Sequence, residues 1–300
     1  MVIKQFIQSH LDYHVPVDAY RCATINAARE YGFKDLGALA PGYIADCQIL
    51  KELDGRRPEA VFAMGKLVAM NGEYLPEKTG AGPSIPPRVD LAGLGSPDDL
   101  RIAVPGKPSG NVQVRCMTPI AKNLPYHKDE WVSLPVVDGF AFLGDAKKDY
   151  QFVAVVNRYG KPAKTIALIK GFGLKEGAFA STISHDSHNM AIVYTSAEDA
   201  WAAAKELERT GGGITLVSQG KAIRTLALPV GGLMSTLPCA ELAAEIEEMT
   251  KAVKERCGSD ASMLATAILS LPVLPGIVIT DKGLVDGRTQ SFIEVIKEQI

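Results

Sequence analysis

Residues 178–194 read Ala-Phe-Ala-Ser-Thr-Ile-Ser-His-Asp-Ser-His-Asn-Met-Ala-Ile-Val-Tyr. Apolar and β-branched side chains fill both ends of this stretch, and such runs favour β-strands. Residues 185–189 lie between the two runs and combine two imidazoles, a carboxylate, a hydroxyl and an amide. We expect two strands joined by a bend, because the two histidines would face opposite sides of one continuous strand.

Two interpretations of residues 185–189 stay open from the residues alone. In the first, the bend is a metal or proton-transfer site, because neutral imidazoles bind divalent metals and a carboxylate binds or orients them. In the second, the five side chains form a hydrogen-bonded polar corner with structural histidines. Composition does not separate the two interpretations.

The overall composition excludes several classes of protein. The chain has 300 residues, 47% of them hydrophobic, and a net charge of −2. This length and hydrophobic fraction are enough for two domains with their own cores. Lysines and arginines are scattered, so no nucleic-acid partner is expected. No apolar run approaches the roughly 20 residues that cross a bilayer, so neither a membrane span nor a signal peptide is expected. Five widely spaced cysteines without a Cys-x-x-Cys pair favour reduced thiols and a cytoplasmic location.

The first part of the chain predicts a helix followed by a small sheet. Small residues recur at helical spacing over residues 16–31, and Gly32 is placed to end that helix. A strand is expected at 44–50, and two runs around Gly65 predict a hairpin within 60–69. The stretch from 76 to 97 is rich in proline, glycine and serine, which is typical of a linker.

The second part predicts mixed α and β structure. Further strands are expected at 101–104, 112–114, 131–134, 152–156 and 165–169. Beyond residue 194, capping signals at Thr195 and Ser196 predict a helix to Glu208. Later elements are a hairpin turning at Gln219-Gly220, a long helix over 238–257, and short helices near 261–270 and 289–299.

Three glycine-rich motifs are compatible with function or with plain geometry. The Gly211-Gly212-Gly213 triplet follows a helix and precedes a strand, so it is interpreted as a helix end. The sequence Gly231-Gly232-Leu233-Met234-Ser235 either presents N–H groups to a polar ligand or makes a tight turn. Residues 171–175 form either a mobile lip of a pocket or a simple turn.

Several motifs, in the same order along the chain, resemble bacterial adenine deaminases of the amidohydrolase superfamily. Two upstream motifs, at 23–29 and 37–46, are similar to the end of an amidohydrolase barrel entering its β-sandwich. The others resemble the C-terminal domain of adenine deaminases, namely 171–175, 178–189, 211–213, 228–235, 271–275 and 280–286. The resemblance is weakest around 76–150.

The resemblance implies an α+β fold in which a small β-sandwich remnant of an amidohydrolase is followed by an adenine deaminase C-terminal domain. The expected division is a remnant of the last barrel helix over 1–35, a β-sandwich segment over 36–80, a linker over 81–99 and the α+β domain over 100–300.

The resemblance also implies hydrolysis of adenine to hypoxanthine and ammonia with Mn²⁺ or Fe²⁺. The family carries its principal metal ligands on barrel strands, and these have no counterpart among the 300 residues. A (β/α)₈ barrel needs roughly 200 residues or more, and about thirty precede the sandwich strands here. We therefore expect a purine ligand and a barrel-bearing partner chain or a homo-oligomer.

The candidate site residues gather around the histidine motif. His185, Asp186 and His188 are the candidate catalytic residues, and both histidines are also candidate metal ligands. Ser187, Asn189 and Phe172 are the candidate substrate-binding residues. The alternatives are a non-catalytic purine- or metal-binding regulatory module derived from the same fold, and a gene product without independent activity.

Overall fold

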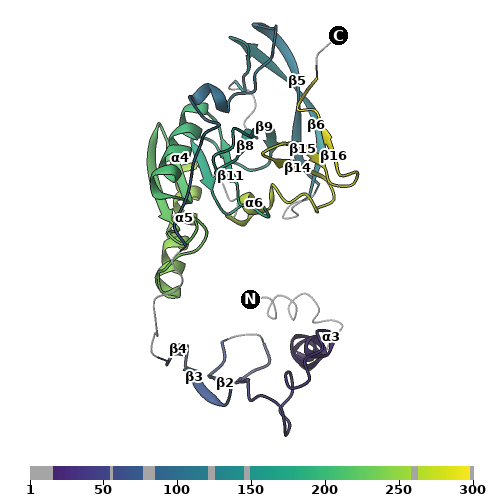
Figure 1. Cartoon of the computed structure of the whole chain (residues 1–300), viewed down its shortest axis with the longest axis vertical. Coiled ribbons are helices and arrows are strands. Elements are labelled where there is room, and N and C mark those ends of the chain that lie inside the picture. Colours follow the sequence, from purple (N-terminus) through teal and green to yellow (C-terminus); the bar gives the residue numbers. More distant parts are fainter. Residues whose placement is uncertain are drawn as a thin grey trace. The chain divides into compact units, whose positions relative to one another are not determined.

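Two structural units make up the chain, with the division between Ala81 and Gly82 (Figure 1). The computed structural model describes residues 16–54, 57–76, 85–120, 126–144, 149–257 and 263–297. The first unit is a helix followed by a small antiparallel sheet, and the second is a large mixed sheet with helices and a further small sheet. This organisation confirms the α+β prediction.

The helix of the first unit has three consecutive parts. It begins with α2 (Pro16–Arg21), continues through the π-helical η1 (Cys22–Asn26) and ends with α3 (Ala27–Glu30). Gly32 follows with φ 75°, and its N–H donates to the Arg29 carbonyl at 3.1 Å. A left-handed glycine at this point ends a helix without a Cβ clash, as the sequence predicts.

The sheet of the first unit is a meander of short antiparallel strands. Its order is β1 (Cys47–Ile49), β2 (Ala60–Ala63), β3 (Lys66–Met70) and β4 (Glu73–Tyr74). Between β2 and β3, Met64 and Gly65 both have positive φ, at 50° and 76°. Two such residues make the turn that matches the twist of a hairpin, so the predicted hairpin around Gly65 is confirmed.

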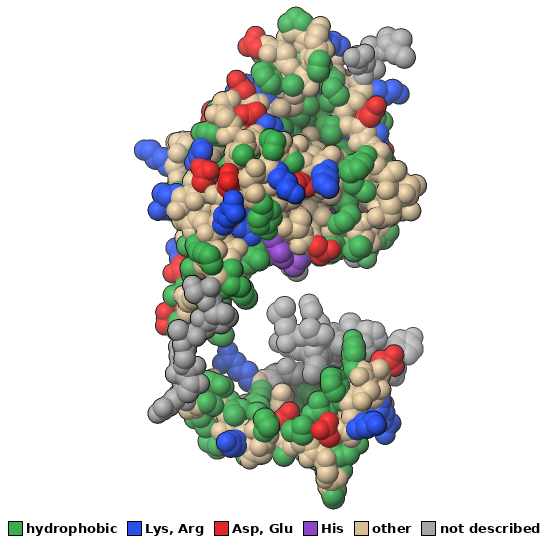
Figure 2. Space-filling model, in the orientation of Figure 1, with side chains coloured by type: hydrophobic (Ala, Val, Ile, Leu, Met, Phe, Trp, Pro, Cys, Tyr) green, Lys and Arg blue, Asp and Glu red, His purple; other side chains and the backbone are tan. Residues whose placement is uncertain are grey.

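The first unit leaves much of its apolar surface exposed. The hydrophobic residues buried among its described residues are the small ones Ala19, Ala28 and Ala60. Tyr31 and Leu39 are each 79% exposed. Figure 2 shows hydrophobic side chains spread over the visible face of this unit. Many of the large apolar side chains that the structure describes in this unit are therefore exposed to solvent.

The large sheet of the second unit has the order β13-β12-β10-β11-β8-β9-β5-β6-β7, with β17 pairing β5. Neighbours pair antiparallel except β5 and β9, which are parallel. The strands are β5 (Ser109–Pro119), β6 (His127–Val137), β7 (Phe140–Ala141), β8 (Tyr150–Val156), β9 (Lys164–Lys170), β10 (Ala178–Ser181), β11 (Met190–Tyr194), β12 (Gly213–Ser218), β13 (Lys221–Ala227) and β17 (Ile296–Lys297).

Helices and a small sheet flank the large sheet. The elements are η2 (Pro97–Leu100), α4 (Ala197–Thr210), α5 (Cys239–Cys257), α6 (Met263–Ile268), β14 (Ile277–Thr280), β15 (Gly283–Asp286) and β16 (Ser291–Ile293). The helix α4 begins as predicted, because the Ser196 side chain accepts a hydrogen bond from the Asp199 N–H. It ends at Gly211 with φ 76°, which confirms the helix-end interpretation of the glycine triplet.

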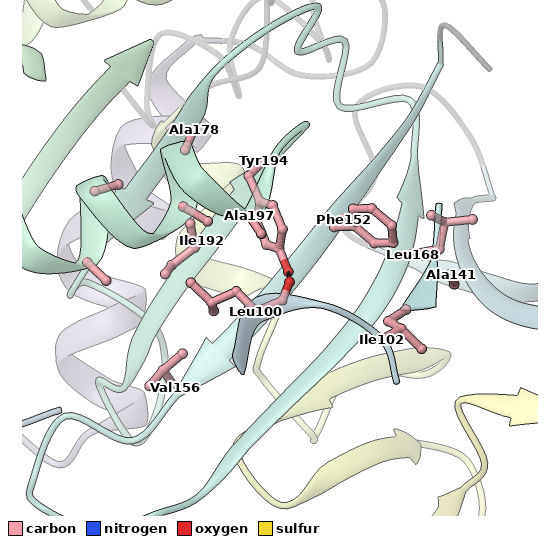
Figure 3. Packing of buried hydrophobic residues seen from close by; sticks show 14 of the residues in the cluster. Leu100, Ile102, Ala141, Phe152, Val156, Leu168, Ala178, Ile192, Tyr194 and Ala197 are labelled. Carbon is pink, nitrogen blue, oxygen red and sulfur yellow. Dashed lines mark hydrogen bonds between the residues drawn. The ribbon is translucent and has the colours of Figure 1, made fainter. Parts of the chain in front are cut away.

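The central strands β8 and β11 are buried on both faces of the large sheet, and successive strand residues point to opposite faces. On β8, Phe152, Ala154 and Val156 belong to one core cluster, which includes the alanine face of α4. Val153 and Val155 belong to the other, which includes Met249 of α5 and apolar residues of β14. In the first cluster the Tyr194 hydroxyl donates to the Leu100 carbonyl at 2.6 Å (Figure 3).

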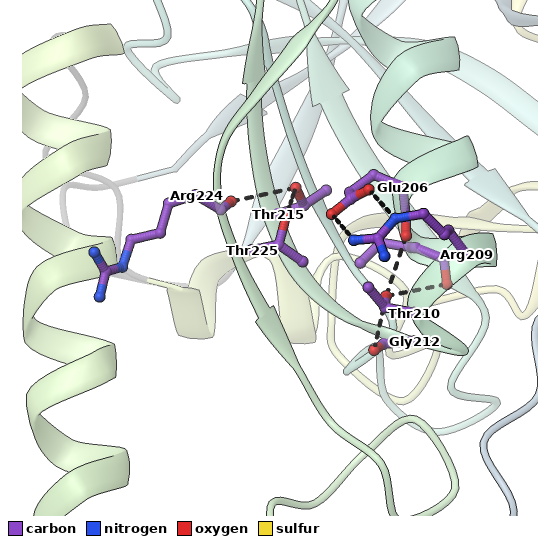
Figure 4. Close-up of polar contacts among 8 residues, drawn as sticks. Glu206, Arg209, Thr210, Gly212, Thr215, Arg224 and Thr225 are labelled. Carbon is purple, nitrogen blue, oxygen red and sulfur yellow. Dashed lines mark hydrogen bonds and ion pairs between the residues drawn. The ribbon is translucent and has the colours of Figure 1, made fainter.

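Polar contacts fix the end of α4 and the strands that follow it (Figure 4). Arg209 pairs with Glu206 at 2.8 Å. The Thr210 hydroxyl donates to the Gly212 carbonyl at 3.3 Å. Across β12 and β13, the Thr215 and Thr225 hydroxyls lie 2.9 Å apart. The triple glycine thus leads from α4 into β12 through a bonded turn.

Residues 85–99, which include most of the stretch expected to be a linker, pack on the second unit. Leu91 and Leu94 are 4% and 5% exposed and join the first core cluster. Lys164 on β9 donates to the Gly93 carbonyl at 2.8 Å and to the Asp99 carboxylate at 2.6 Å. The hydrogen bond from Lys164 is the main cause that holds the pKa of Asp99 below its usual value.

Two local predictions differ from the structure. The helix expected near 289–299 is wrong where the structure describes it, because β16 and β17 lie there and Ile296 pairs with Val114 of β5. The β-branched and aromatic residues of this segment prefer a strand when a sheet edge is available. In the strand expected at 101–104, only Ala103 makes a β-bridge, to Phe140.

Candidate functional site

The motif at 185–189 lies in the connection between two neighbouring strands of the large sheet. β10 ends at Ser181 and β11 begins at Met190, and Ser181 pairs with Ala191 across the two strands. The chain between them, residues 182–189, is called the histidine loop here. The bend expected between two β-prone runs is therefore confirmed.

Hydrogen bonds to the C-terminal part of the chain anchor the start of the loop. The His185 N–H donates to the Ala267 carbonyl at 2.7 Å, and the Ser270 hydroxyl donates to the His185 carbonyl at 2.6 Å. The buried Ser184 and Ser270 hydroxyls lie 2.5 Å apart. The His188 N–H donates a hydrogen bond to the Ser184 carbonyl at 2.6 Å, which closes a turn. The helix α6 and the residues after it thus fix this half of the loop.

Arg158 anchors the end of the loop from inside the second unit. It is 2% exposed and lies two residues after the end of β8. Its Nε donates to the His188 carbonyl at 2.6 Å, while Nη1 reaches the Arg88 carbonyl at 2.7 Å and Nη2 the Gly231 carbonyl at 3.0 Å. One side chain therefore joins the histidine loop to two other segments.

Tyr159 supports the same part of the loop from the surface. Its hydroxyl lies within hydrogen-bond distance of the Ser187 carbonyl at 2.9 Å and of the His188 carbonyl at 3.2 Å. The Arg158 guanidinium carbon lies 4.8 Å from the centre of the Tyr159 ring, an arrangement that allows cation–π attraction. The side chain remains 43% exposed.

Four polar side chains of the loop are unpaired although its backbone is bonded. Within the described residues, the side chains of His185, Asp186, Ser187 and His188 make no hydrogen bond and no ion pair. Asp186 and Ser187 are exposed and both histidines are half-buried. Figure 2 shows histidine side chains on the visible face of the second unit. A rigid backbone that presents unpaired polar groups is the arrangement of a binding surface.

The two imidazoles of the loop lie close together and are electrostatically coupled. Their ring centres are 5.4 Å apart with an edge-on orientation. Partial burial lowers the pKa of His188 below its usual value, and the neighbouring His185 and Arg158 lower it further against the opposing effect of Asp186. A neutral imidazole at pH 7 can accept a proton or a hydrogen bond, or act as a metal ligand.

Two buried polar atoms of the loop lack a hydrogen-bond partner within the part of the chain that the structure describes. These are Nδ1 of His188 and Oδ1 of Asn189, and Asn189 is only 2% exposed. Buried polar atoms are rarely left unpaired in proteins, so such atoms invite an explanation. A ligand that carries N–H donors would satisfy the carboxamide oxygen.

Phe172 has a different setting from the other candidate residues. Its ring is 6% exposed and belongs to the second core cluster. The glycine-flanked segment 171–173 follows β9, and Gly171 and Gly173 both have φ 79°. The structure therefore gives Phe172 a packing role, and a role in binding substrate stays a prediction.

The loop offers part of a metal site. Two imidazoles on one metal ion, with ligand distances of about 2 Å, would place their ring centres roughly 5 Å apart, which agrees with the 5.4 Å observed. A third ligand is needed, and no group of three His, Cys, Asp or Glu side chains suited to a metal occurs among the described residues. The residues that the structure describes therefore do not complete a metal centre.

Sequence reasoning missed the residues that hold the loop. Arg158, Tyr159 and Ser270 supply bonds to its backbone, yet they lie 26 residues or more from residue 185 in the sequence. A signal does exist at Asn157-Arg158-Tyr159, because three polar residues follow directly on the apolar strand 152–156. In the structure the Asn157 side chain also donates to Asp281 at 2.9 Å.

The helices of the described residues are all too short or too polar to cross a membrane.

Comparison with known proteins places this chain beside the adenine deaminases. The family model described as "Adenine deaminase C-terminal domain" matches residues 126–291, and the model of the amidohydrolase family matches residues 1–68. Adenine deaminase 2 of Carboxydothermus hydrogenoformans is 38% identical over 279 residues, which cover 91% of this chain and 47% of that protein.

Other curated relatives give the same result. The adenine deaminase of Nitratidesulfovibrio vulgaris is 34% identical over 95% of this chain and 51% of its own length. That of Bacillus pumilus is 35% identical over 98% of this chain and 50% of its own length. The chain thus spans about half the length of the curated relatives it matches. Because the C-terminal model covers more than half of its residues, the chain belongs to the adenine deaminase C-terminal domain family.

Proposed function

We propose that these 300 residues form the C-terminal part of an enzyme that hydrolyses adenine to hypoxanthine and ammonia, and that the histidine loop forms one wall of its purine site. The relatives matched over about half their length are named adenine deaminases. The observation that carries the proposal is the contrast within the loop, whose backbone is bonded on both sides while four polar side chains remain free.

In this proposal, His188 and Asn189 recognise the purine. Adenine carries an exocyclic amino group and a ring N–H, which are hydrogen-bond donors. The neutral His188 imidazole and the buried Asn189 carboxamide oxygen are acceptors that have no partner among the described residues. Pairing these atoms with the base would remove the cost of leaving them unsatisfied.

His185 and Asp186 lie beside this pair, and we propose that they transfer a proton during deamination. Deamination adds water at the carbon that bears the amino group and releases ammonia, so a proton must move from the attacking water to the leaving nitrogen. Imidazoles and carboxylates perform such transfers near neutral pH. A divalent metal, Mn²⁺ or Fe²⁺ in our proposal, would activate the water when bound. His185 and His188 could at most contribute to its coordination, because a third ligand is missing among the described residues.

The amidohydrolase part of the relatives would supply the remaining groups. The exposed apolar side chains of the first unit support this view, because residues 1–68 match an amidohydrolase model and described residues such as Tyr31 and Leu39 are largely exposed. We infer that this unit packs against further amidohydrolase structure in the active assembly, whether that structure is carried by a longer form of the protein or by a partner chain.

A chimaera tests the proposal. The N-terminal half of the Carboxydothermus relative would be joined to this chain, and ammonia release from adenine measured with Mn²⁺ present. We expect activity, and we expect His188→Ala to lower kcat by about 100-fold or more, as loss of an acid–base group does. His127→Gln removes a histidine outside the loop and serves as the matched control.

Three outcomes are informative. Activity that falls with His185→Ala and His188→Ala but not with His127→Gln supports the proposal. Full activity in both loop variants would refute the role of the loop. Adenine binding by this chain without turnover in the chimaera would favour a purine-binding module over an enzyme part.

A further inference from the structure

Arg158 is a buried cation whose hydrogen-bond partners are all backbone carbonyls. It is 2% exposed, and its guanidinium donates to the carbonyls of Arg88, His188 and Gly231. Within the described ranges it forms no ion pair with a carboxylate. A buried cation is costly unless its donors are well satisfied, so this site is built around the guanidinium.

The geometry of the site requires arginine in particular. The three carbonyls come from segments 70, 30 and 73 residues away in the sequence. A guanidinium presents its N–H groups in one plane and in fixed directions, whereas a lysine ammonium is a compact charge. Only the planar group can join three such segments at once with separate nitrogens.

The neighbouring glycine leaves the space that the guanidinium needs. Gly232 has φ 74°, and a Cβ built on it would lie 2.8 Å from Nη1 of Arg158. Its own carbonyl accepts from the Thr182 hydroxyl at 2.6 Å, at the first residue of the histidine loop. The Gly231-Gly232 turn, left open between a ligand site and a tight turn, therefore serves here to seat Arg158.

His188 is held in a backbone conformation that it does not adopt readily. Its φ is 50°, in the left-handed region that a Cβ disfavours. Such conformations persist where several surrounding contacts hold the residue in place. Here the His188 carbonyl accepts from Arg158 at 2.6 Å and the His188 N–H donates to Ser184 at 2.6 Å. The bond from Arg158 is thus part of what keeps the His188 ring beside His185.

We propose that Arg158 is the positioning residue of the histidine loop, fixing the His188 backbone so that the loop presents its imidazoles in one arrangement before a ligand binds. The effect on the loop stands by itself. The consequence for deamination rests on the proposed function.

The test compares Arg158→Lys and Arg158→Ala with the unchanged 300-residue chain by amide hydrogen exchange. We expect the amides of residues 184–189 to exchange about ten-fold faster in both variants, since a charge-assisted bond is lost, while the strands β8 and β11 keep their protection. Adding guanidinium ion at low millimolar concentration should slow loop exchange again in Arg158→Ala but not in Arg158→Lys. Arg209→Lys, at a side chain 70% exposed, is the matched control.

The same variants in the chimaera separate this inference from the proposed function. Faster loop exchange together with a lower kcat, both restored by guanidinium in Arg158→Ala, supports both. Faster loop exchange with unchanged deamination supports the positioning role and refutes the catalytic role of the loop. Unchanged exchange in Arg158→Lys, or an equal increase throughout the second unit, would overturn the positioning role and leave the proposed function standing.

Discussion

The two units of this chain differ in how they bury apolar side chains. In the second unit, strand residues alternate between two core clusters, and large side chains such as Leu207 and Ile192 are fully buried. In the first unit, the buried hydrophobic residues that the structure describes are alanines, while Met64 and Tyr74 are 77% and 71% exposed. Burial of apolar area is the dominant source of stability, so the second unit carries its own core, whereas the described residues of the first unit do not form one.

This contrast in burial matches the different roles that we propose for the two units. The second unit can hold a strained, hydrogen-bonded loop because the strands on both sides of it are fixed by their own packing. The first unit presents surface that monomeric proteins rarely leave open, and such patches mark interfaces. In the function that we propose, the second unit supports the site and the first contacts further amidohydrolase structure.

The largest expected effect on stability comes from truncating a core side chain of the second unit. Leu207→Ala removes a fully buried side chain of α4 and should lower the free energy of unfolding by about 3 kcal/mol. Leu67→Ala, at a residue 37% exposed in the first unit, should cost less than about 1 kcal/mol. Urea unfolding followed by circular dichroism measures both changes, and equal losses of stability would contradict the difference in burial between the two units.

Acid should destabilise the second unit through His127. Loss of solvent around its ring lowers the pKa of this histidine from 6.5 to about 4. Between those pH values the unfolded chain takes up a proton that the folded chain does not, so stability falls as the pH drops and is fully present above pH 6.5. We expect a loss of about 1–3 kcal/mol.

The variant His127→Gln isolates this contribution. Thermal unfolding of both proteins between pH 7 and pH 4 gives the difference in stability at each pH. The unchanged chain should lose more stability than the variant over this range. Parallel curves would show that His127 titrates normally in the folded protein.

A smaller effect on stability is expected from removing the buried Tyr194 hydroxyl. Tyr194→Phe removes the donor to the Leu100 carbonyl, and an unpaired buried carbonyl costs about 1–2 kcal/mol. Tyr74→Phe, on the exposed β4 of the first unit, should change stability by less than about 0.5 kcal/mol. Chemical denaturation measures the stability of both variants. Equal losses of stability would contradict the expected difference between the buried and the exposed tyrosine.

The smallest expected effect is at the start of α4. Ser196→Ala removes the side-chain oxygen that accepts from the Asp199 N–H, a change that costs about 1 kcal/mol in other helices. The midpoint of urea unfolding should fall without a change in slope. An unchanged midpoint would mean that Asp199 or solvent replaces the cap.

The sequence predicted the elements whose pattern is local. The apolar runs at 152–156 and 165–169 became β8 and β9, and Gly65 and Gly220 turn hairpins because each follows a residue that also takes positive φ. The histidine loop was found for the same reason, because its polar residues interrupt two β-prone runs. Local propensity and position were sufficient in these cases.

The sequence did not predict what depends on distant contacts. Strands form within residues 291–297 because the edges of β5 and β15 are available to pair with them. No pattern within the segment indicates those partner strands. Arg158 reaches the loop across 30 residues and Gly231 across 73. Such contacts require the tertiary arrangement of the sheet, which periodicity alone does not give.

Native-state hydrogen exchange on the whole chain tests the division between the two units most directly. We predict that amides of β8 and β11 exchange only through global unfolding of the second unit, whereas amides of β2 and β3 exchange through local opening of much lower free energy. Equal protection of the two sets would contradict it, because the first unit would then be stable without a partner surface.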